Sequence, residues 1–428
     1  MFSKEGIMSS IIFHIDVNSA FLSWTALSLL EQGDTTDLRD VASIIGGDKD
    51  KRHGIVLAKS TKAKSYGIQT GEPIVNAFKK CPILVMASPD HKMYQQRSRA
   101  LMEFLASICP DIEQVSVDEC YMNYAPIAHQ YENPLAAAHM IKDQVYKKFG
   151  FTVNIGISDR KVLTKMASDF QKPNLVHTLY SYEIKEKMWP LPVEDLYMCG
   201  HSSVETLRKL EILTIGDLAN ANLNILLSHL KSHGKTLWNF ANGIDNSTVE
   251  TLQEKAKGVG NSTTVSKDIT EAEDAYKVLM SLAESVGRRL RKENQLAGNV
   301  CCEIKYNNFQ SVSHQTTLTT ATDSTTLIYE TARYLFDELW NGNPIRLLGI
   351  RTSKLSDITE PIQLSLFDML PSKKNVTTSP NATNHSRKQK EEKLDKALDL
   401  IKNKYGKDSV VRGSLLTEKN SSKHQESF

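Results

Sequence analysis

The sequence predicts an α+β protein, and three observations support this prediction. Residues 8–180 alternate short apolar runs of β-branched and aromatic residues with segments of helical spacing. Residues 190–245 contain short helical segments and no good strand. Residues 262–355 return to strands, which two long helices separate. A chain of 428 residues has room for about three such domains.

The composition is typical of a soluble globular protein, with 40% hydrophobic and 24% charged residues. The net charge of +2 does not indicate a nucleic-acid partner. Evidence for such a partner must come from local patches of basic residues. The six cysteines form no Cys-x-x-Cys pair and lie at no zinc-ligand spacing, so we expect reduced thiols. Because no apolar run has the length of a membrane span or the form of a signal peptide, the sequence predicts a cytoplasmic protein without a membrane partner.

The first region opens with the apolar run of residues 11–15, which predicts a buried strand that ends at Asp16. A second strand is expected at residues 55–58, before a basic helical turn that Gly67 ends. The other elements expected in this region are helices at 20–30, 95–108 and 139–149, and strands at 115–124 and 152–157.

The last region again combines apolar runs typical of strands with residues at helical spacing. Its expected elements are helices at 272–293 and 325–340 and strands at 299–306, 311–317 and 346–354. Residues 371–385 are rich in Ser, Thr, Asn, Lys and Pro, too polar to bury a core, which indicates a linker. Beyond it, apolar residues from Leu394 to Tyr405 recur at helical spacing and predict a final amphipathic helix that docks elsewhere.

Two adjacent carboxylates, Asp118 and Glu119, interrupt the strand pattern of residues 115–124. In a regular strand they would point to opposite faces, and one would enter the core at high cost. We therefore expect a hairpin turn that brings both acids to one edge of the sheet, where their repulsion calls for a cation. Mg²⁺ fits because it prefers carboxylate and phosphate oxygens, and Asp16 is the third acid expected there. The alternative is that the pair only forms a turn and that Asp16 only caps a helix.

Five ordered motifs make the chain resemble the Y family of DNA polymerases, the lesion-bypass enzymes. They are IIFHIDVNSAF (11–21), VLAKSTKAKSYGIQTGEP (56–73), VSVDECYM (115–122), GISDRKVLTKMASDFQKPN (156–174) and GNSTTVSKDI (260–269). The resemblance runs from residue 11 to about residue 416. The Ser-Thr-Lys-Ala-Lys pattern at residues 60–64 is similar to the UmuC-like branch, the catalytic subunit type of DNA polymerase V, with a DinB-like polymerase of the polymerase IV type as the competing interpretation.

The resemblance implies a right-hand polymerase with palm, fingers, a helical thumb and an α+β little finger. The expected segments are palm 8–20 and 87–180, fingers 21–86, thumb 181–250 and little finger 258–357. They are followed by a clamp-binding segment 358–370, a flexible linker 371–390, a C-terminal helix 391–416 and a disordered tail 417–428.

The resemblance also implies catalysis by two Mg²⁺ ions, with Mn²⁺ as a substitute. Asp16 and Asp118 would ligate both ions and Glu119 the catalytic one, while the Val17 carbonyl completes the nucleotide-side ion. The three carboxylates are thus the expected catalytic residues.

Phe21 matches the family's steric gate, an aromatic ring that clashes with a ribose 2′-hydroxyl; without the motif, an ordinary core Phe would be the interpretation. Thr61 and Lys64 stand where many members have Tyr and Arg, and a Lys binds phosphate without the bidentate fork of Arg. The other residues expected around the nucleotide are Ser19 and Ala20 beside the gate, Lys172 at the triphosphate, and Ile55 and Leu57 above the templating base.

Contacts with primer-template DNA are expected from two regions. Gly200 lies where members carry a helix-hairpin-helix, although Met198 and Glu211 replace its usual glycines. The basic residues expected along the DNA backbone in the little finger are Lys267, Arg288, Arg289, Arg291 and Lys305.

The segment at residues 363–367 looks like the bacterial sliding-clamp peptide, with a loop that folds back on its own domain as the alternative. Its expected clamp-binding residues are Gln363, Leu364, Leu366 and Phe367. The UmuC-like branch also suggests a UmuD-like accessory subunit and a recombinase filament as partners.

The predicted function is template-directed, error-prone translesion synthesis from dNTPs in DNA damage tolerance of the SOS type. A nucleotidyl cyclase, which shares a palm-like site, and a non-catalytic DNA-bound scaffold are the alternatives from other classes. A cyclase has no use for a thumb or a clamp peptide, and a scaffold would not need all three acids and the gate.

Overall fold

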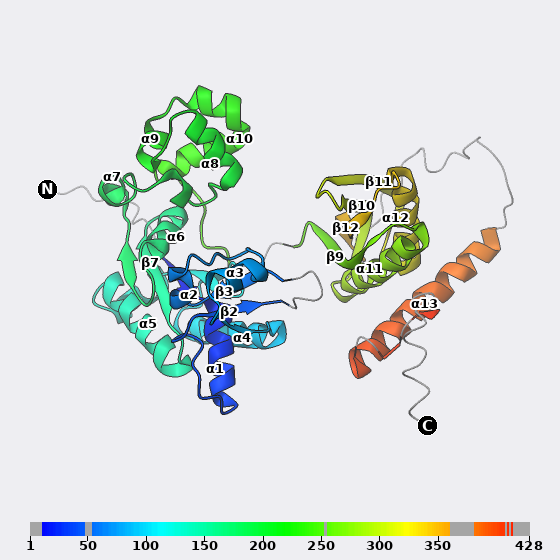
Figure 1. Cartoon of the computed structure of the whole chain (residues 1–428), viewed down its shortest axis with the longest axis horizontal. Helices are drawn as coiled ribbons and strands as arrows, with labels where there is room; N and C mark the ends of the chain where they lie inside the picture. The colour runs from blue at the N-terminus through cyan, green and yellow to red at the C-terminus, as the bar shows by residue number, and fades with distance from the viewer. Residues whose placement is uncertain are drawn as a thin grey trace. The chain divides into compact units, whose positions relative to one another are not determined.

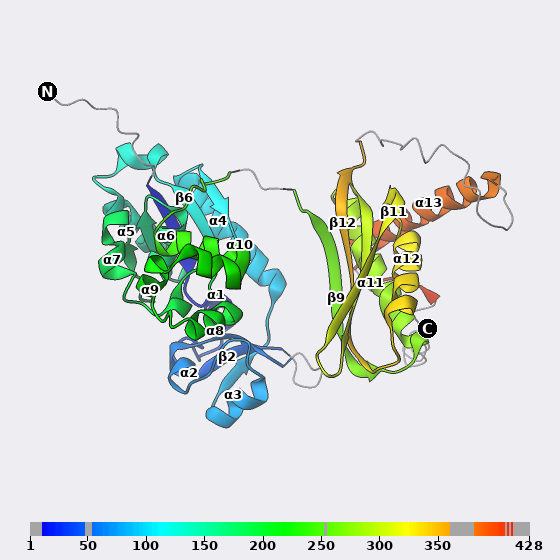
Figure 2. The ribbon, with the colours of Figure 1, turned by 90° about the horizontal axis from the view of Figure 1, so that it is seen from above.

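The computed structural model describes residues 11–47, 54–251, 255–359, 381–406, 409–410 and 412–413. The chain forms two compact units that divide between residues 253 and 254 (Figures 1 and 2). The mixed α+β class predicted from the sequence is confirmed. No helix among these described residues is long and apolar enough to cross a membrane.

A five-stranded sheet with the order β5-β6-β1-β7-β8 forms the centre of the first unit. Its strands are β1 (Ile12–Val17), β5 (Ile112–Gln114), β6 (Glu119–Asn123), β7 (Val153–Ser158) and β8 (Val176–Thr178). The central strand β1 pairs antiparallel with β6 and β7 and is buried along its whole length, as its apolar run predicts. All five strands lie within the segments expected for the palm.

Helices cover both faces of this sheet. They are α1 (Ala20–Glu31), α4 (His91–Ile108), α5 (Pro134–Phe149) and α6 (Lys161–Asp169). Phe13 and Ile15 of β1 share a buried core with α4 and α5, whereas the alternate residue His14 contacts Ser168 at α6. The face toward α6 is closely packed, because a Cβ at Gly156 would lie 2.6 Å from the Ser168 backbone nitrogen.

Residues 43–87 form a second, smaller sheet of order β3-β2-β4. Its elements are β2 (Ser43–Gly46), β3 (Val56–Lys59), α2 (Thr61–Ser65), α3 (Ile74–Lys80) and β4 (Val85–Ala87). The sequence predicted β3 and the turn of α2, which ends before Gly67 at φ 74°. The strands β2 and β4 and the helix α3 were not predicted.

Residues 181–251 carry short helices and contain no strand, as expected. The helices are α7 (Ile184–Lys187), α8 (His201–Lys209), α9 (Ile215–Asn220) and α10 (Leu223–Ala241). Their buried side chains form one core with the apolar side of α6.

The second unit contains a four-stranded antiparallel sheet of order β11-β10-β12-β9. Its elements are β9 (Gly258–Ile269), α11 (Ala272–Lys292), β10 (Gln295–Tyr306), β11 (Ser311–Thr322), α12 (Thr325–Leu339) and β12 (Ile345–Asp357). Both helices share the sheet's apolar core. The strand β9 was not predicted, because its Gly, Ser and Thr residues are largely exposed and show no apolar alternation.

The C-terminal helix α13 spans Asn381–Tyr405. The linker prediction for residues 371–390 is therefore wrong from residue 381 onward, and the helix predicted at 391–416 begins and ends earlier. The apolar residues of the helix were expected to dock it, but Leu394, Leu400 and Tyr405 are 50–72% exposed. Ion pairs make its contacts instead. The clamp-binding residues 363–367 and the tail 417–428 lie outside the described residues.

Candidate active site

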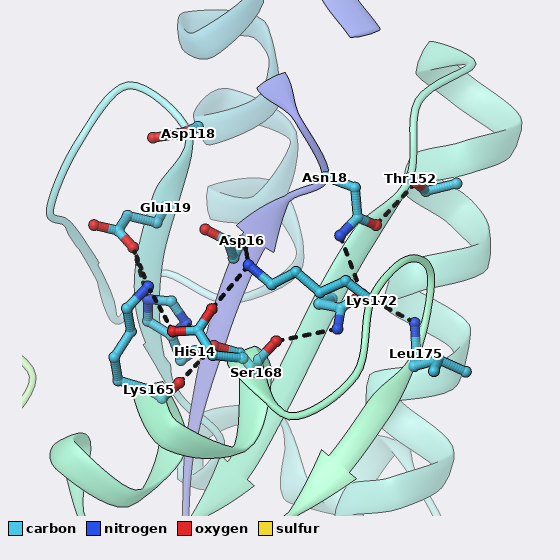
Figure 3. Close-up of polar contacts among 12 residues, drawn as sticks. His14, Asp16, Asn18, Asp118, Glu119, Thr152, Lys165, Ser168, Lys172 and Leu175 are labelled. Carbon is cyan, nitrogen blue, oxygen red and sulfur yellow. Dashed lines mark hydrogen bonds and ion pairs between the residues drawn. The ribbon is translucent and has the colours of Figure 1, made fainter. Parts of the chain in front are cut away.

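The three predicted acids lie at neighbouring strand ends (Figure 3). Asp16 of β1 is the direct antiparallel partner of Glu119 at the start of β6. The Val17 backbone nitrogen donates to the Asp118 carbonyl oxygen at 3.0 Å. The expected hairpin is present, since β5 and β6 pair across residues 115–118, but only Asp118 lies in the turn, whereas Glu119 is the first residue of the inner strand β6. Within that turn the Ser116 hydroxyl donates to Asp118 Oδ1 at 2.5 Å.

Two lysines from one side of the sheet face these acids. Lys165 Nζ on α6 lies 2.8 Å from Glu119 Oε2. Lys172, in the loop after α6, pairs with Asp16 and lies 2.8 Å from Asp169. Sequence reasoning identified Lys172 but missed Lys165, whose helical position gave no sign of the acid across the sheet.

His14 lies under Glu119 and is completely buried. Its Nδ1 is 2.8 Å from the Ser168 hydroxyl, and its Nε2 is 3.2 Å from Glu119 Oε2 in an alignment too poor for a regular hydrogen bond. Burial lowers the pKa of His14 and outweighs the contact with Glu119, which favours the neutral ring. Sequence reasoning missed this residue, whose alternation with Phe13 and Ile15 places it on the α6 face.

The two neighbouring carboxyls are shifted in opposite directions. Burial, followed by the charges of Asp16 and Glu119, raises the pKa of Asp118, although the Ser116 hydrogen bond opposes the rise. The contact with His14 and then the Lys165 ammonium lower the pKa of Glu119 to about 2, against the effect of burial. Burial alone would lower the pKa of Lys172, but Asp16 and Asp169 raise it. The site therefore holds excess negative charge that the lysines balance only in part.

The donor atoms of these residues suit a divalent cation, although the side chains are not already arranged around a metal position. Among the described residues no group of three His, Cys, Asp or Glu side chains is arranged to hold a metal ion. The donors at the strand ends are nevertheless all carboxylate oxygens, which suit Mg²⁺. The pKa of Asp118 is raised first by burial and then by the charges of Asp16 and Glu119, so its ionised form is disfavoured there and a cation would stabilise it. The carboxylates thus suit a divalent cation in chemistry, and Lys172 occupies Oδ2 of Asp16 in this structure.

A cavity of about 600 Å³ opens beside the acids. It is lined by Asp16, Val17, Ser19, Ala20, Phe21, Leu57, Thr61, Lys64, Asp118 and Lys172, together with residues that were not predicted. Segments far apart in the sequence, β1, β3, α2 and the loop after α6, therefore converge on one space. Glu119 and Ile55 do not line it, and Ile55 is 44% exposed.

The predicted gate residue Phe21 has a rigid support. Its ring stacks on Tyr94 with centroids 4.3 Å apart and an interplanar angle of 8°. The Tyr94 hydroxyl is 2.7 Å from the Thr25 hydroxyl in a buried contact. Phe21 thus lines the cavity with its position fixed from behind, and sequence reasoning did not find Tyr94.

Two buried amides, Asn18 and Asn154, hold the loop of Lys172 against the sheet, and Figure 3 shows Asn18 with its partner Thr152. Asn18 Oδ1 accepts from the Asn174 backbone nitrogen at 2.9 Å and from the Thr152 hydroxyl at 2.9 Å. Asn18 Nδ2 donates to Asn154 Oδ1 at 3.1 Å, and Asn154 in turn donates to the Gln171 carbonyl at 2.6 Å. The satisfied network fixes the backbone on both sides of Lys172.

Comparison with known proteins decides the family. The family model described as "impB/mucB/samB family" matches residues 15–169, and the model of its C-terminal domain matches residues 256–366. A protein of Clostridium acetobutylicum named DNA polymerase IV is 44% identical over 96% of this chain and 99% of its own length. The chain belongs to the Y family of DNA polymerases.

Other relatives agree with this membership. The DNA polymerase IV of Alkaliphilus oremlandii is 34% identical, over 96% of this chain and 100% of the relative. A solved Y-family DNA polymerase chimera superimposes with a TM-score of 0.69, covering 81% of this chain and 99% of the chimera, at 18% identity, which shows the shared fold. The prediction of the UmuC-like branch is not supported, because these relatives are named DNA polymerase IV, the DinB-like type.

The residues expected at the triphosphate of this polymerase all line the cavity. Thr61 and Lys64 are exposed on α2, and Lys172 lies in the loop after α6. Lys59 also lines the cavity, although sequence reasoning did not name it. Burial, followed by the charge of Lys64, lowers the pKa of Lys59, so an anion in the cavity would favour the charged form of this ammonium.

Two positions near Gly200, where the family usually has glycine, are occupied by other residues but keep a backbone conformation that favours glycine. Gly200 itself is the N-cap of α8, and its φ of −76° needs no glycine. Met198 and Glu211 adopt φ values of 67° and 60° in the left-handed region. Both side chains therefore occupy backbone positions that favour glycine, at a cost in local strain.

The basic residues predicted to contact DNA differ in availability. Arg289 and Lys267 are exposed, and Arg288 and Lys305 are half-buried. Arg291 is a correction, because its side chain is only 10% exposed and pairs with Asp395 and Asp399 of α13. The guanidinium is satisfied within the unit and is not free for a phosphate.

Proposed function

We propose that this protein is a template-directed, error-prone translesion DNA polymerase that acts in DNA damage tolerance of the SOS type. The observation that supports the proposal best is the cavity that collects Asp16, Asp118, Phe21, Lys64 and Lys172 from four separate segments. Acids that can hold a cation, an aromatic ring that can screen the sugar, and two ammonium groups that can bind phosphate suit the positioning and charge stabilisation that dNTP addition needs. Polymerase IV, the DinB-like type, is the subclass that the relatives' names favour.

Catalysis rests on the three carboxylates. Asp16, Asp118 and Glu119, with the Val17 carbonyl, would hold two Mg²⁺ ions. When bound, these ions lower the pKa of the primer 3′-hydroxyl and balance charge on the α-phosphate and pyrophosphate. Mn²⁺ can replace Mg²⁺ at oxygen ligands of this kind.

The residues of the cavity wall select and orient the nucleotide. Lys64 and Lys172 bind the triphosphate as point charges, and Thr61 adds a hydroxyl. Phe21, fixed against Tyr94, excludes a ribose 2′-hydroxyl. Leu57 lines the cavity and can cover the templating base, whereas the exposed Ile55 contributes at the outer rim.

Ser19 and Ala20 make the turn that starts α1 and aims Phe21 into the cavity. Ser19 adopts a left-handed φ of 47° and is followed directly by the first residue of α1. Both residues line the cavity together with Val17, whose carbonyl is expected at the nucleotide-side ion.

Binding to primer-template DNA and to a sliding clamp completes the proposal. Arg289 and Lys267 are exposed and suit a phosphate backbone, as do Arg288 and Lys305 to a lesser degree. The sequence of residues 363–367 suits a hydrophobic clamp groove, and such a tether offsets weak DNA affinity. A UmuD-like subunit and a recombinase filament are not proposed, because they followed from the UmuC-like branch.

Primer extension with Mg²⁺ on undamaged and abasic templates tests the proposal. Asp118→Ala should bind primer-template DNA like the wild type and lose nucleotide incorporation, because a cation ligand is missing. Asp143→Ala, which removes a 69% exposed carboxylate of the same unit, is the matched control and should stay active. Wild-type incorporation by Asp118→Ala would disprove the assignment.

A further inference from the structure

Lys165 makes a contact that the proposed catalytic chemistry does not yet explain. It extends from α6 across the sheet, and its side chain is only 15% exposed. Its ammonium lies 2.8 Å from Glu119 Oε2 and 3.5 Å from Asp169 Oδ2. Ordering a long, flexible side chain costs rotamer entropy, which favourable contacts must offset. The shorter contact, with Glu119, is the stronger of the two.

The contacts of Glu119 are one-sided. Lys165 Nζ at 2.8 Å and His14 Nε2 at 3.2 Å both approach Oε2. Within the described part of the chain, Oε1 has no hydrogen bond or ion pair. One oxygen of the carboxylate is therefore fixed while the other is left for a further ligand.

The base of this arrangement is rigid. His14 is completely buried and is fixed by the Ser168 hydroxyl at 2.8 Å. The helix α6 lies so close to β7 that a side chain at Gly156 would collide with the Ser168 backbone. Because α6 packs directly on the β7 backbone, the fold sets the distance that Lys165 must span to reach Glu119.

We propose that Lys165 is a positioning residue for Glu119, whose Oε2 it holds so that Oε1 can ligate a divalent cation. Glutamate has three rotatable side-chain bonds, and an unheld carboxylate would spend much of its time away from the cation. A cationic donor behind a ligating carboxylate fixes the orientation of that carboxylate, as outer contacts do at many metal sites. This inference rests on the proposed polymerase function of the same site.

The test compares Lys165→Met with Lys161→Met. Lys161 lies one turn earlier on α6 and is 12% exposed, and it forms a similar pair at 2.7 Å with Glu113, which is not one of the three site acids. The first measurement avoids turnover: Mn²⁺ is titrated, with detection by electron paramagnetic resonance, into each protein bound to primer-template DNA and an α,β-imido dNTP. The second is single-turnover incorporation, and thermal unfolding reports whether each variant is folded.

Lys165→Met should weaken Mn²⁺ binding and slow incorporation by about 10- to 100-fold relative to Lys161→Met. Lys165→Arg should retain most of both, because its guanidinium can donate to the same oxygen. Lys165→Gln, which keeps a donor without the charge and serves if the Met variant is unstable, should lie between them.

Two results would overturn the proposal. One is Mn²⁺ affinity and incorporation in Lys165→Met equal to those of Lys161→Met. The other is tighter Mn²⁺ binding in Lys165→Met, which would mean that the ammonium competes with the cation. Either result leaves the polymerase assignment intact, because that assignment fails only if Asp118→Ala remains active.

Discussion

Replacement of Arg291 by Met should release the C-terminal helix α13 from the second unit. Met keeps much of the apolar stem and removes only the guanidinium. In the structure Arg291 Nε lies 2.6 Å from Asp399, and Nη1 lies 3.3 Å from Asp395. Nη1 also donates to the Asp323 carbonyl at 2.7 Å, at the start of α12.

The magnitude follows from burial and from what remains after the substitution. The side chains of Arg291, Asp395 and Asp399 are 10%, 4% and 18% exposed. Removal of one partner from a buried ion pair costs about 3–5 kcal/mol. Asp395 keeps the Arg412 guanidinium at 2.9 Å and the Thr325 backbone nitrogen at 3.0 Å, so the low end of this range applies. A loss of about 3 kcal/mol raises the undocked population of α13 about 100-fold.

Amide hydrogen exchange of residues 393–405 measures this population directly. Arg291→Met should accelerate exchange there by about 100-fold while exchange in α11 and α12 changes little. Arg289→Met is the matched control, because Arg289 is exposed and its contact is with the Gly260 carbonyl at 2.7 Å. Unchanged protection of α13 in Arg291→Met, or equal deprotection in both variants, would refute the reasoning.

Three further outcomes are expected. Phe21→Ala should raise ribonucleotide insertion relative to deoxynucleotide insertion by roughly tenfold or more, measured by single-nucleotide extension, because the cavity then accepts a 2′-hydroxyl; an unchanged ratio would contradict the gate. Lys172→Ala should raise the KM for dNTP by about 10- to 100-fold through loss of a charge-assisted contact, whereas an effect on DNA affinity alone would argue against it. Without metal, Asp118→Asn should raise the unfolding temperature at pH 7 by a few degrees, because the raised pKa of Asp118 means that its ionised form destabilises the folded state. This gain should vanish as the pH falls through the folded pKa of Asp118 toward 4, where the wild-type carboxyl is protonated; a gain that persists at low pH would contradict the cause.

The elements that the sequence predicted well are those with buried apolar patterns. The strand β1 is apolar up to Asp16 and is buried throughout, and α11 and α12 carry clear helical spacing. The strand β9 escaped prediction because its sheet position depends on its partner β12 rather than on its own apolar residues. The helix α13 was predicted from its apolar residues, yet ion pairs to α11 hold it.

The sequence predicted the acids and the gate residue of the candidate site, but not the residues that hold Glu119 in place. Asp118 and Glu119 stand out because two adjacent acids conflict with a regular strand. Lys165 and His14 have no such conflict, since a lysine on a helix and a histidine in a strand are ordinary residues until the sheet brings them to Glu119. Arg291 was misassigned because a run of basic residues in the sequence does not reveal which of them bind DNA and which pair with acids of the same protein. In the structure Arg291 pairs with Asp395 of α13.

A crystal structure with primer-template DNA, Mg²⁺ and an α,β-imido dNTP tests the central claim most directly. The account predicts two cations bound by Asp16, Asp118 and Glu119, with Lys172 moved from Asp16 to the triphosphate. Nucleotide bound in the cavity with Lys172 still on Asp16, and with no cation at the three carboxylates, would contradict it.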